Sequence, residues 1–187
     1  MKLGRGRRRS LVAVAVVVMT AVLVVGLYLF QPWKLWQDET VREALPTASP
    51  ATPTVPPSGA ASVPPAAPAA PQTLAEGAFI SHEHDTRGTA QVIRLSDGSH
   101  VLRLEGLDTS NGPDLRVWLT DAPVKQGVAG WRVFDDGKYV SLGRLKGNKG
   151  DQNYAIPAGV HLADYTSVAI WCDRFDVSFG AAELATT

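Results

Sequence analysis

The chain has 187 residues, with 18 basic and 18 acidic side chains and therefore no formal net charge. This balance excludes a simple nucleic-acid-binding protein, which is normally basic. The one cysteine, Cys172, cannot form an intramolecular disulfide, so packing must hold the fold together. The length allows one domain, or two at most.

A membrane-spanning helix is predicted at residues 11–30, after a basic tail at residues 1–10. The run from Leu11 to Phe30 carries no charge, and a helix of 20 residues spans about 30 Å, the thickness of the hydrocarbon core. Trp33 and Trp36 follow, where interfacial aromatic side chains belong. The positive-inside rule predicts a single-pass protein of the cell membrane, with a cytoplasmic N-terminus and an extracytoplasmic C-terminal domain.

A cleaved signal peptide is the alternative interpretation of this segment. Its apolar region would be shorter, about 7–15 residues, and small residues would mark a cleavage site. Here the bulky sequence Gln31-Pro32-Trp33-Lys34-Leu35-Trp36 follows instead, so an uncleaved anchor that contacts the lipid bilayer is favoured. Arg8-Arg9 before the apolar run matches a twin-arginine signal only weakly.

Residues 31–73 are predicted to be a juxtamembrane segment and a Pro/Ala-rich linker. Nine of the 13 prolines lie between Pro46 and Pro71. Proline fixes φ and removes a hydrogen-bond donor, so neither helix nor sheet should persist there. We expect a disordered, extended stalk between membrane and domain. Glycosylation of its Thr and Ser residues, or binding to a Pro-recognising partner, stays open.

Residues 74–187 are predicted to form one all-β domain, an antiparallel sandwich or barrel-like fold of about eight strands. Short alternating runs separated by Gly, Asp and Asn are typical of such folds. Asp97-Gly98 predicts a two-residue hairpin turn that pairs Ser96 with Ser99. That register places four apolar residues on one face: Ile93, Leu95, Leu102 and Leu104.

The last predicted strands indicate the direction in which the cysteine side chain points. Val168, Ile170 and Cys172 alternate and therefore share one face. Phe175, Val177 and Phe179 continue with the parity shifted by one, and a bulge or tight turn at Asp173-Arg174 would return all six to the same face. Cys172 is therefore predicted to point into the core.

The sequence lacks the motifs of several kinds of functional site. The sequence contains no phosphate-binding glycine loop, no Cys-x-x-Cys, no Cys-x-x-Cys-His and no His-Glu-x-x-His. Its methionines, Met1 and Met19, lie outside the domain and cannot supply an axial ligand there. The sequence also has no nucleophile elbow, so no motif supports a hydrolase. No catalytic motif is present, so a protein other than a classical enzyme is favoured, although enzyme activity stays open.

Three side chains are the candidates for a site. Cys172 is either a small buried core residue or a redox thiol or cofactor ligand. His82 and His84 lie two apart, so in an extended segment both imidazoles could reach one metal ion. The alternative for the two histidines, favoured on spacing alone, is a solvated loop after the first strand.

Six short motifs occur in a fixed order after residue 76. They are Gly77-x-Phe79; His84 four residues before Gly88; Asp97-Gly98 with Leu102 and Leu104; Gly112-Pro113-Asp114-Leu115-x-Val117-x-Leu119; Leu142-Gly143-x-Leu145-Lys146-Gly147-Asn148-x-Gly150-x-Gln152-x-Tyr154-x-Ile156-Pro157; and Val168-x-Ile170-Trp171-Cys172-x-x-Phe175-x-Val177-x-Phe179. Together they resemble the DM-thirteen family, an "electron transfer" domain also found in membrane-anchored bacterial proteins. The resemblance covers about Gly77 to Leu184.

This resemblance implies a redox role centred on Cys172, with His84 as the expected partner in holding a cofactor. A metal or a haem is compatible with that role, although no firm motif indicates either. The resemblance also implies a redox partner in the cell envelope and gives no indication of which one. The alternative function is a non-catalytic cell-envelope binding module in which Cys172 is core packing.

Overall fold

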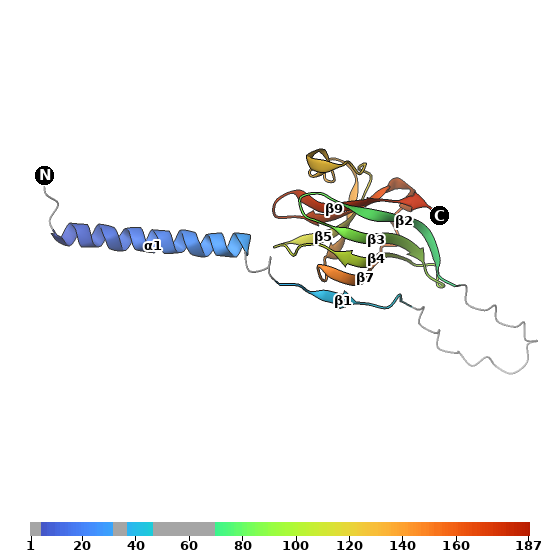
Figure 1. The fold of residues 1–187 in the computed structure, drawn as a ribbon, viewed down its shortest axis with the longest axis horizontal. Helices are drawn as coiled ribbons and strands as arrows, with labels where there is room; N and C mark the ends of the chain where they lie inside the picture. Colours follow the sequence, from blue (N-terminus) through green and yellow to red (C-terminus); the bar gives the residue numbers. More distant parts are fainter. Residues whose placement is uncertain (1–4, 32–36, 47–69) are drawn as a thin grey trace, which may run out of the picture.

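The computed structural model describes residues 5–31, 37–46 and 70–187 (Figure 1). It contains an N-terminal helix and a β domain. The predicted interfacial residues Trp33 and Trp36, and the Pro-rich run from 47 to 69, lie outside the described residues.

The helix α1 (Arg5–Phe30) confirms the predicted helix and begins six residues before it. Its apolar stretch, Arg9–Phe30, has a mean hydropathy of 2.8, and none of its residues is buried in the described structure. Val17 and Met19, for example, are 67% and 70% exposed. An apolar surface of this kind on all sides of a helix needs a lipid or protein cover. The helix is long and apolar enough to cross a bilayer.

Ten strands form one sheet in the described part of the chain, which confirms the all-β prediction with more strands than expected. Two short 3-10 helices, η2 (Gly127–Gly130) and η3 (Leu162–Asp164), lie in the connections. The sheet order is β1-β7-β4-β3-β2-β9-β8-β5-β6, and β10 pairs with β2. The strands are β1 (Thr40–Arg42), β2 (Gln72–Ser81), β3 (Arg87–Arg94), β4 (His100–Asp108), β5 (Leu115–Thr120), β6 (Tyr139–Arg144), β7 (Lys149–Ile156), β8 (Ser167–Cys172), β9 (Val177–Glu183) and β10 (Ala185–Thr186).

The sheet curls at β2 and encloses the main core. Residues Gln72–Ala78 of β2 pair with β3, whereas Phe79–Ser81 pair with β9, so β2 belongs to both halves. Alternate side chains of the two halves meet between them, as the period of two requires. Fully buried examples are Leu102 on β4, Val117 on β5 and Ile170 on β8. The core therefore has the layered arrangement of a sandwich.

The register of the β3–β4 hairpin differs from the prediction by one residue. Arg94 pairs with His100, and the amide of Leu95 donates to the carbonyl of Ser99, so the turn has three residues. Gly98 ends it with φ of +83°, as in a type I turn followed by a left-handed residue. The shift moves Ile93 and Leu95 to the outer face, away from the two core leucines of β4.

The β8–β9 hairpin confirms the predicted direction of the cysteine. Cys172 lines the main core, as do Val177 and Phe179 after the tight turn at residues 173–176. Phe175 lies in that turn and is 37% exposed, so its predicted inward position is wrong. The turn itself absorbs the change of parity, which leaves Phe175 at the tip of the hairpin.

Strand β1 lies within the segment assigned to the linker, and the sequence pattern does not predict it. Its three residues pair in parallel with β7, from Thr40 opposite Lys149 to Arg42 opposite Asp151. It forms the edge of the sheet beside β7 in Figure 1. Residues before the Pro-rich run therefore belong to the fold of the domain.

Candidate functional site

Cys172 is the last residue of β8 and is fully buried in the main core. Its cross-strand neighbours are Leu115 on β5 and Val177 on β9. Burial raises the pKa of the thiol, while nearby backbone N–H groups, those of Arg174 and Phe175 first, act to lower it. The thiol is therefore protonated at neutral pH, but the N–H groups around the sulfur would stabilise negative charge there.

His84 lies at the rim of the same core. Its ring packs on Phe179 with centroids 3.9 Å apart, and its Nε2 is 3.2 Å from the Glu83 carboxylate. Phe179 and Cys172 line one core, and the negative charge of Glu83 also raises the Cys172 pKa. Within residues 70–187, no hydrogen bond joins His84 to the thiol. The structure brings the two predicted residues to the same core without placing them in direct contact.

His82 faces a different part of the domain. It is 8% exposed, its Nδ1 is 2.9 Å from the Ser178 hydroxyl, and its Nε2 is 3.0 Å from the Lys125 carbonyl. Because a carbonyl only accepts, Nε2 carries the proton. Burial lowers the pKa of His82, and the Lys125 carbonyl acts in the opposite direction. Its ring packs 5.7 Å from that of Phe134 in a second apolar cluster.

The two histidines therefore do not share a face as an extended segment would require. The chain bends after β2 ends at Ser81, which sends His82 to the second apolar cluster and His84 to the main core. In the parts of the chain described, no group of three or more His, Cys, Asp or Glu side chains is arranged to hold a metal ion. The geometry favours a structural role for His82.

A row of aromatic rings covers the outer face of β5 and β8. Tyr139 stacks on Trp118 at 4.0 Å between ring centroids, and Trp118 lies 5.0 Å from Trp171. Phe134 meets the edge of Trp171 at 6.5 Å. Tyr139 is 46% exposed, whereas Trp171 is 1% exposed. The sequence signal for this row was the pair of tryptophans at outward positions of two strands.

A cavity of about 470 Å³ lies beside the turn that precedes β5. It is lined by the Gly112-Pro113-Asp114 turn, by the 144–148 region and by residues 37–39. Asp114 pairs with Arg144 at 3.3 Å and with Arg116 at 3.4 Å. The backbone N–H of Asp114 is also one of those that lower the Cys172 pKa. One turn therefore connects the wall of the cavity to the surroundings of the sulfur.

The chain matches the family model described as "Electron transfer DM13" over residues 78–184. The chain belongs to the DM13 family. No curated protein and no solved structure shows a significant similarity to it. The match begins within β2 and ends after β9, so the DM13 domain includes Cys172 and His84 but not β1.

Proposed function

We propose that the protein takes part in electron transfer as a membrane-anchored, extracytoplasmic DM13 domain, with Cys172 as a redox thiol or as the ligand of a redox cofactor. The environment of the Cys172 sulfur is the observation that supports this proposal. The thiol is completely buried, yet backbone N–H groups from the turns on both sides of it oppose the effect of burial on its pKa. Such N–H groups tune sulfur ligands and thiolates in redox proteins.

The proposed organisation places a basic cytoplasmic tail at residues 1–10, the membrane helix at 11–30, a segment that contains β1 and the Pro-rich run at 31–73, and the DM13 domain at 74–187. The length and hydropathy of α1, together with the five basic residues before Ser10, support this topology. In this arrangement the bilayer holds the redox domain next to electron carriers of the cell envelope.

The two modes of Cys172 make different demands on the fold. As a cofactor ligand, the thiol must lose its proton and the core must open at Sγ, with His84 as the second side chain at that core. As a free redox thiol, it loses one electron to a one-electron oxidant in the envelope, and its proton must leave the closed core for solvent. The free thiol requires a smaller opening of the core, because only a proton, and not a cofactor, has to pass.

The aromatic row supports the second mode. Indole and phenol rings are, with thiols, the protein groups most easily oxidised by one electron. The row leads from the exposed ring of Tyr139 through Trp118 to Trp171. Trp171 is the residue before Cys172 in β8, with its side chain on the opposite face of the strand. An electron from the sulfur would therefore have a route to the surface of the domain.

The test is a count of electron equivalents on the full-length protein in detergent. We expect either a bound metal or chromophore, or one oxidisable equivalent, that is lost in Cys172→Ser while the protein stays folded. His161→Ala, a change in an exposed histidine outside the main core, serves as the control and should keep the signal. Loss of nothing but stability in Cys172→Ser would contradict the proposal.

A non-catalytic binding module is the second candidate function, because the β7 edge pairs with an extended segment, β1, and domain side chains form hydrogen bonds with that segment. In that case Cys172 only fills the core. The same titration separates the two functions, since a binding module has no redox equivalent to lose.

A further inference from the structure

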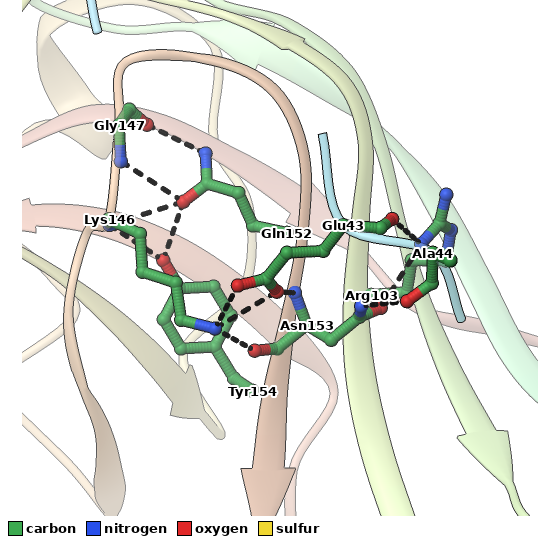
Figure 2. Close-up of polar contacts among 8 residues, drawn as sticks. All are labelled: Glu43, Ala44, Arg103, Lys146, Gly147, Gln152, Asn153 and Tyr154. Carbon is green, nitrogen blue, oxygen red and sulfur yellow. Dashed lines mark hydrogen bonds and ion pairs between the residues drawn. The ribbon is translucent and has the colours of Figure 1, made fainter. Parts of the chain in front are cut away.

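The segment that follows the membrane helix is bound to the DM13 domain at both of its ends. At its C-terminal end, both Glu43 carboxylate oxygens accept from Lys146 Nζ, at 2.7 and 2.9 Å (Figure 2). The Asn153 amide donates to Glu43 at 2.7 Å, and its side chain donates to the Ala44 carbonyl at 2.8 Å. Arg103 donates to the Glu43 carbonyl at 3.1 Å. Lys146 holds the pKa of Glu43 below its ordinary value.

At the N-terminal end, Asn148 bridges the two segments. Its Oδ1 accepts from the Glu39 amide at 2.7 Å, and its Nδ2 donates to Asp38 and to the Thr109 carbonyl, both at 2.8 Å. Asn148 is 1% exposed with the segment in place, and two of these three partners, Asp38 and Glu39, belong to the segment. Lys149 adds an ion pair to Asp38 at 2.7 Å.

Two glycines of the DM13 domain leave room for this segment. A Cβ atom at Gly147 would lie 2.4 Å from the Glu39 carbonyl oxygen. One at Gly150 would lie 2.0 Å from the Val41 carbonyl oxygen, and Gly150 also has φ of +94°. Both approaches are far too close for a side chain, so the backbone of the domain is shaped to receive β1.

The connection from the membrane helix to this docked strand is short. Only residues 31–39 separate the end of α1 from β1, whereas residues 43–71 join β1 to β2. A fully extended chain covers at most about 3.6 Å per residue, so nine residues reach roughly 30 Å. In chain order, the Pro-rich run therefore lies between β1 and β2, and residues 31–39 are the segment between the helix and the first strand.

The end of the helix also contacts the hairpin that follows Cys172. The rings of Phe30 and Phe175 stack with centroids 5.7 Å apart. Arg174 donates to the Leu29 carbonyl at 3.1 Å, and its guanidinium lies 6.0 Å from the Tyr28 ring. With α1 as the membrane anchor, this hairpin tip would lie at the level where the helix leaves the bilayer, because the apolar run ends at Phe30.

We propose that β1 is a clamp that docks in cis on the β7 edge and holds the DM13 domain against the outer surface of the bilayer, with the β8–β9 turn facing the lipid headgroups. The distance between domain and membrane is then determined by residues 31–39 and not by the Pro-rich run. This inference rests on the proposed membrane anchoring but not on the redox role. It restricts the partners of the domain to molecules in the membrane or at its surface.

The test asks which segment of the full-length protein holds the domain to the membrane: the docked strand β1 or the Pro-rich run. A recognition sequence for a specific protease is introduced between residues 50 and 60, and the protein is placed in phosphatidylcholine vesicles at less than one chain per vesicle. After complete cleavage, the C-terminal fragment should float with the vesicles because β1 still holds it. Release of the folded fragment would overturn the clamp, since the Pro-rich run would then be the tether. At this dilution, retention requires docking within one chain.

Variants then test whether β1 is responsible for retention. Gly150→Val should release the cleaved fragment, because the side chain displaces the Val41 backbone. Asp38→Ala with Glu43→Ala removes the ion pairs of the clamp without touching the core, and it should increase the released fraction at least severalfold. Asp136→Ala, an exposed acid elsewhere on the domain, is the matched control. Full retention in both clamp variants, with circular dichroism unchanged, would also overturn the proposal. Because vesicle flotation does not depend on redox activity, the clamp and the redox role can fail separately.

Discussion

Replacement of Cys172 by alanine separates packing from redox chemistry. The side chain is fully buried between Leu115 and Val177, so the change leaves a cavity of one sulfur atom in the main core. Loss of a buried group of this size costs about 1–2 kcal/mol. For a domain slightly longer than 100 residues, about 4 °C of melting temperature corresponds to each kcal/mol, so we expect a decrease of about 4–8 °C.

Val177→Ala is the matched control for this prediction. It removes two carbon atoms from the neighbouring position of the same core and should cost about 2 kcal/mol, but it leaves the thiol in place. Both variants are compared by thermal unfolding and by titration of electron equivalents. The proposal requires Cys172→Ala alone to lose the redox signal. If both variants lose it, the signal reports core packing. If neither does, Cys172 is a packing residue.

Three further predictions concern the stability of the domain. Burial raises the pKa of Tyr154 to about 12, so between pH 10 and 12 the unfolded chain loses a proton that the folded chain keeps, and stability should fall by roughly 2–3 kcal/mol. In denaturant unfolding, the free energy of unfolding of Tyr154→Phe should fall less steeply with pH above pH 10. A slope equal to that of the unsubstituted protein would contradict this. Burial lowers the pKa of His82, so stability should be complete above about pH 6.5 and decrease as the pH falls below it, because the unfolded chain takes up the proton first. His82→Gln should reduce that slope in unfolding measured between pH 7.5 and 5, whereas an equally steep slope would point to other groups. Gly98→Val should cost about 1–2 kcal/mol from its positive φ alone, since no atom lies within 4 Å of the new Cβ, and Gly98→Asn should cost less when both are compared by thermal unfolding.

The parts of the structure that depend on local pattern could be predicted. The uncharged run gave the helix α1, and alternation placed Val168, Ile170 and Cys172 in the core. Both signals are properties of neighbouring residues: an unbroken apolar run for the helix and a period of two for the strand. The family resemblance, confirmed over residues 78–184, came from motifs distributed along that same pattern.

The register of the first hairpin could not be read from its turn residues alone. Asp97-Gly98 is compatible with a two-residue and with a three-residue turn. Here the Asp97 carboxylate accepts from the Ser99 amide at 2.9 Å and stabilises the longer turn. The difference of one residue reverses which side of β3 faces the core.

The arrangement around the candidate site depended on distant contacts. Strand β1 has only three residues and is flanked by charged side chains, and its partners lie more than 100 positions away. No local pattern identifies such a strand. The same holds for His82 and His84, for which the sequence favoured a solvated loop and left one shared face as the alternative; the bend after Ser81 separates them and buries His82.

The docked strand also decides where a soluble version of the domain should begin. A protein that starts at Gln72, the first residue of β2, would lack β1, which leaves the N–H and C=O groups of the β7 edge unpaired. Open edges of this kind pair with other chains and promote aggregation. The buried amide of Asn148 would be exposed to water at the same edge. A protein that begins at Gln37 keeps its own edge covered, and it should remain monomeric at concentrations where the shorter one self-associates.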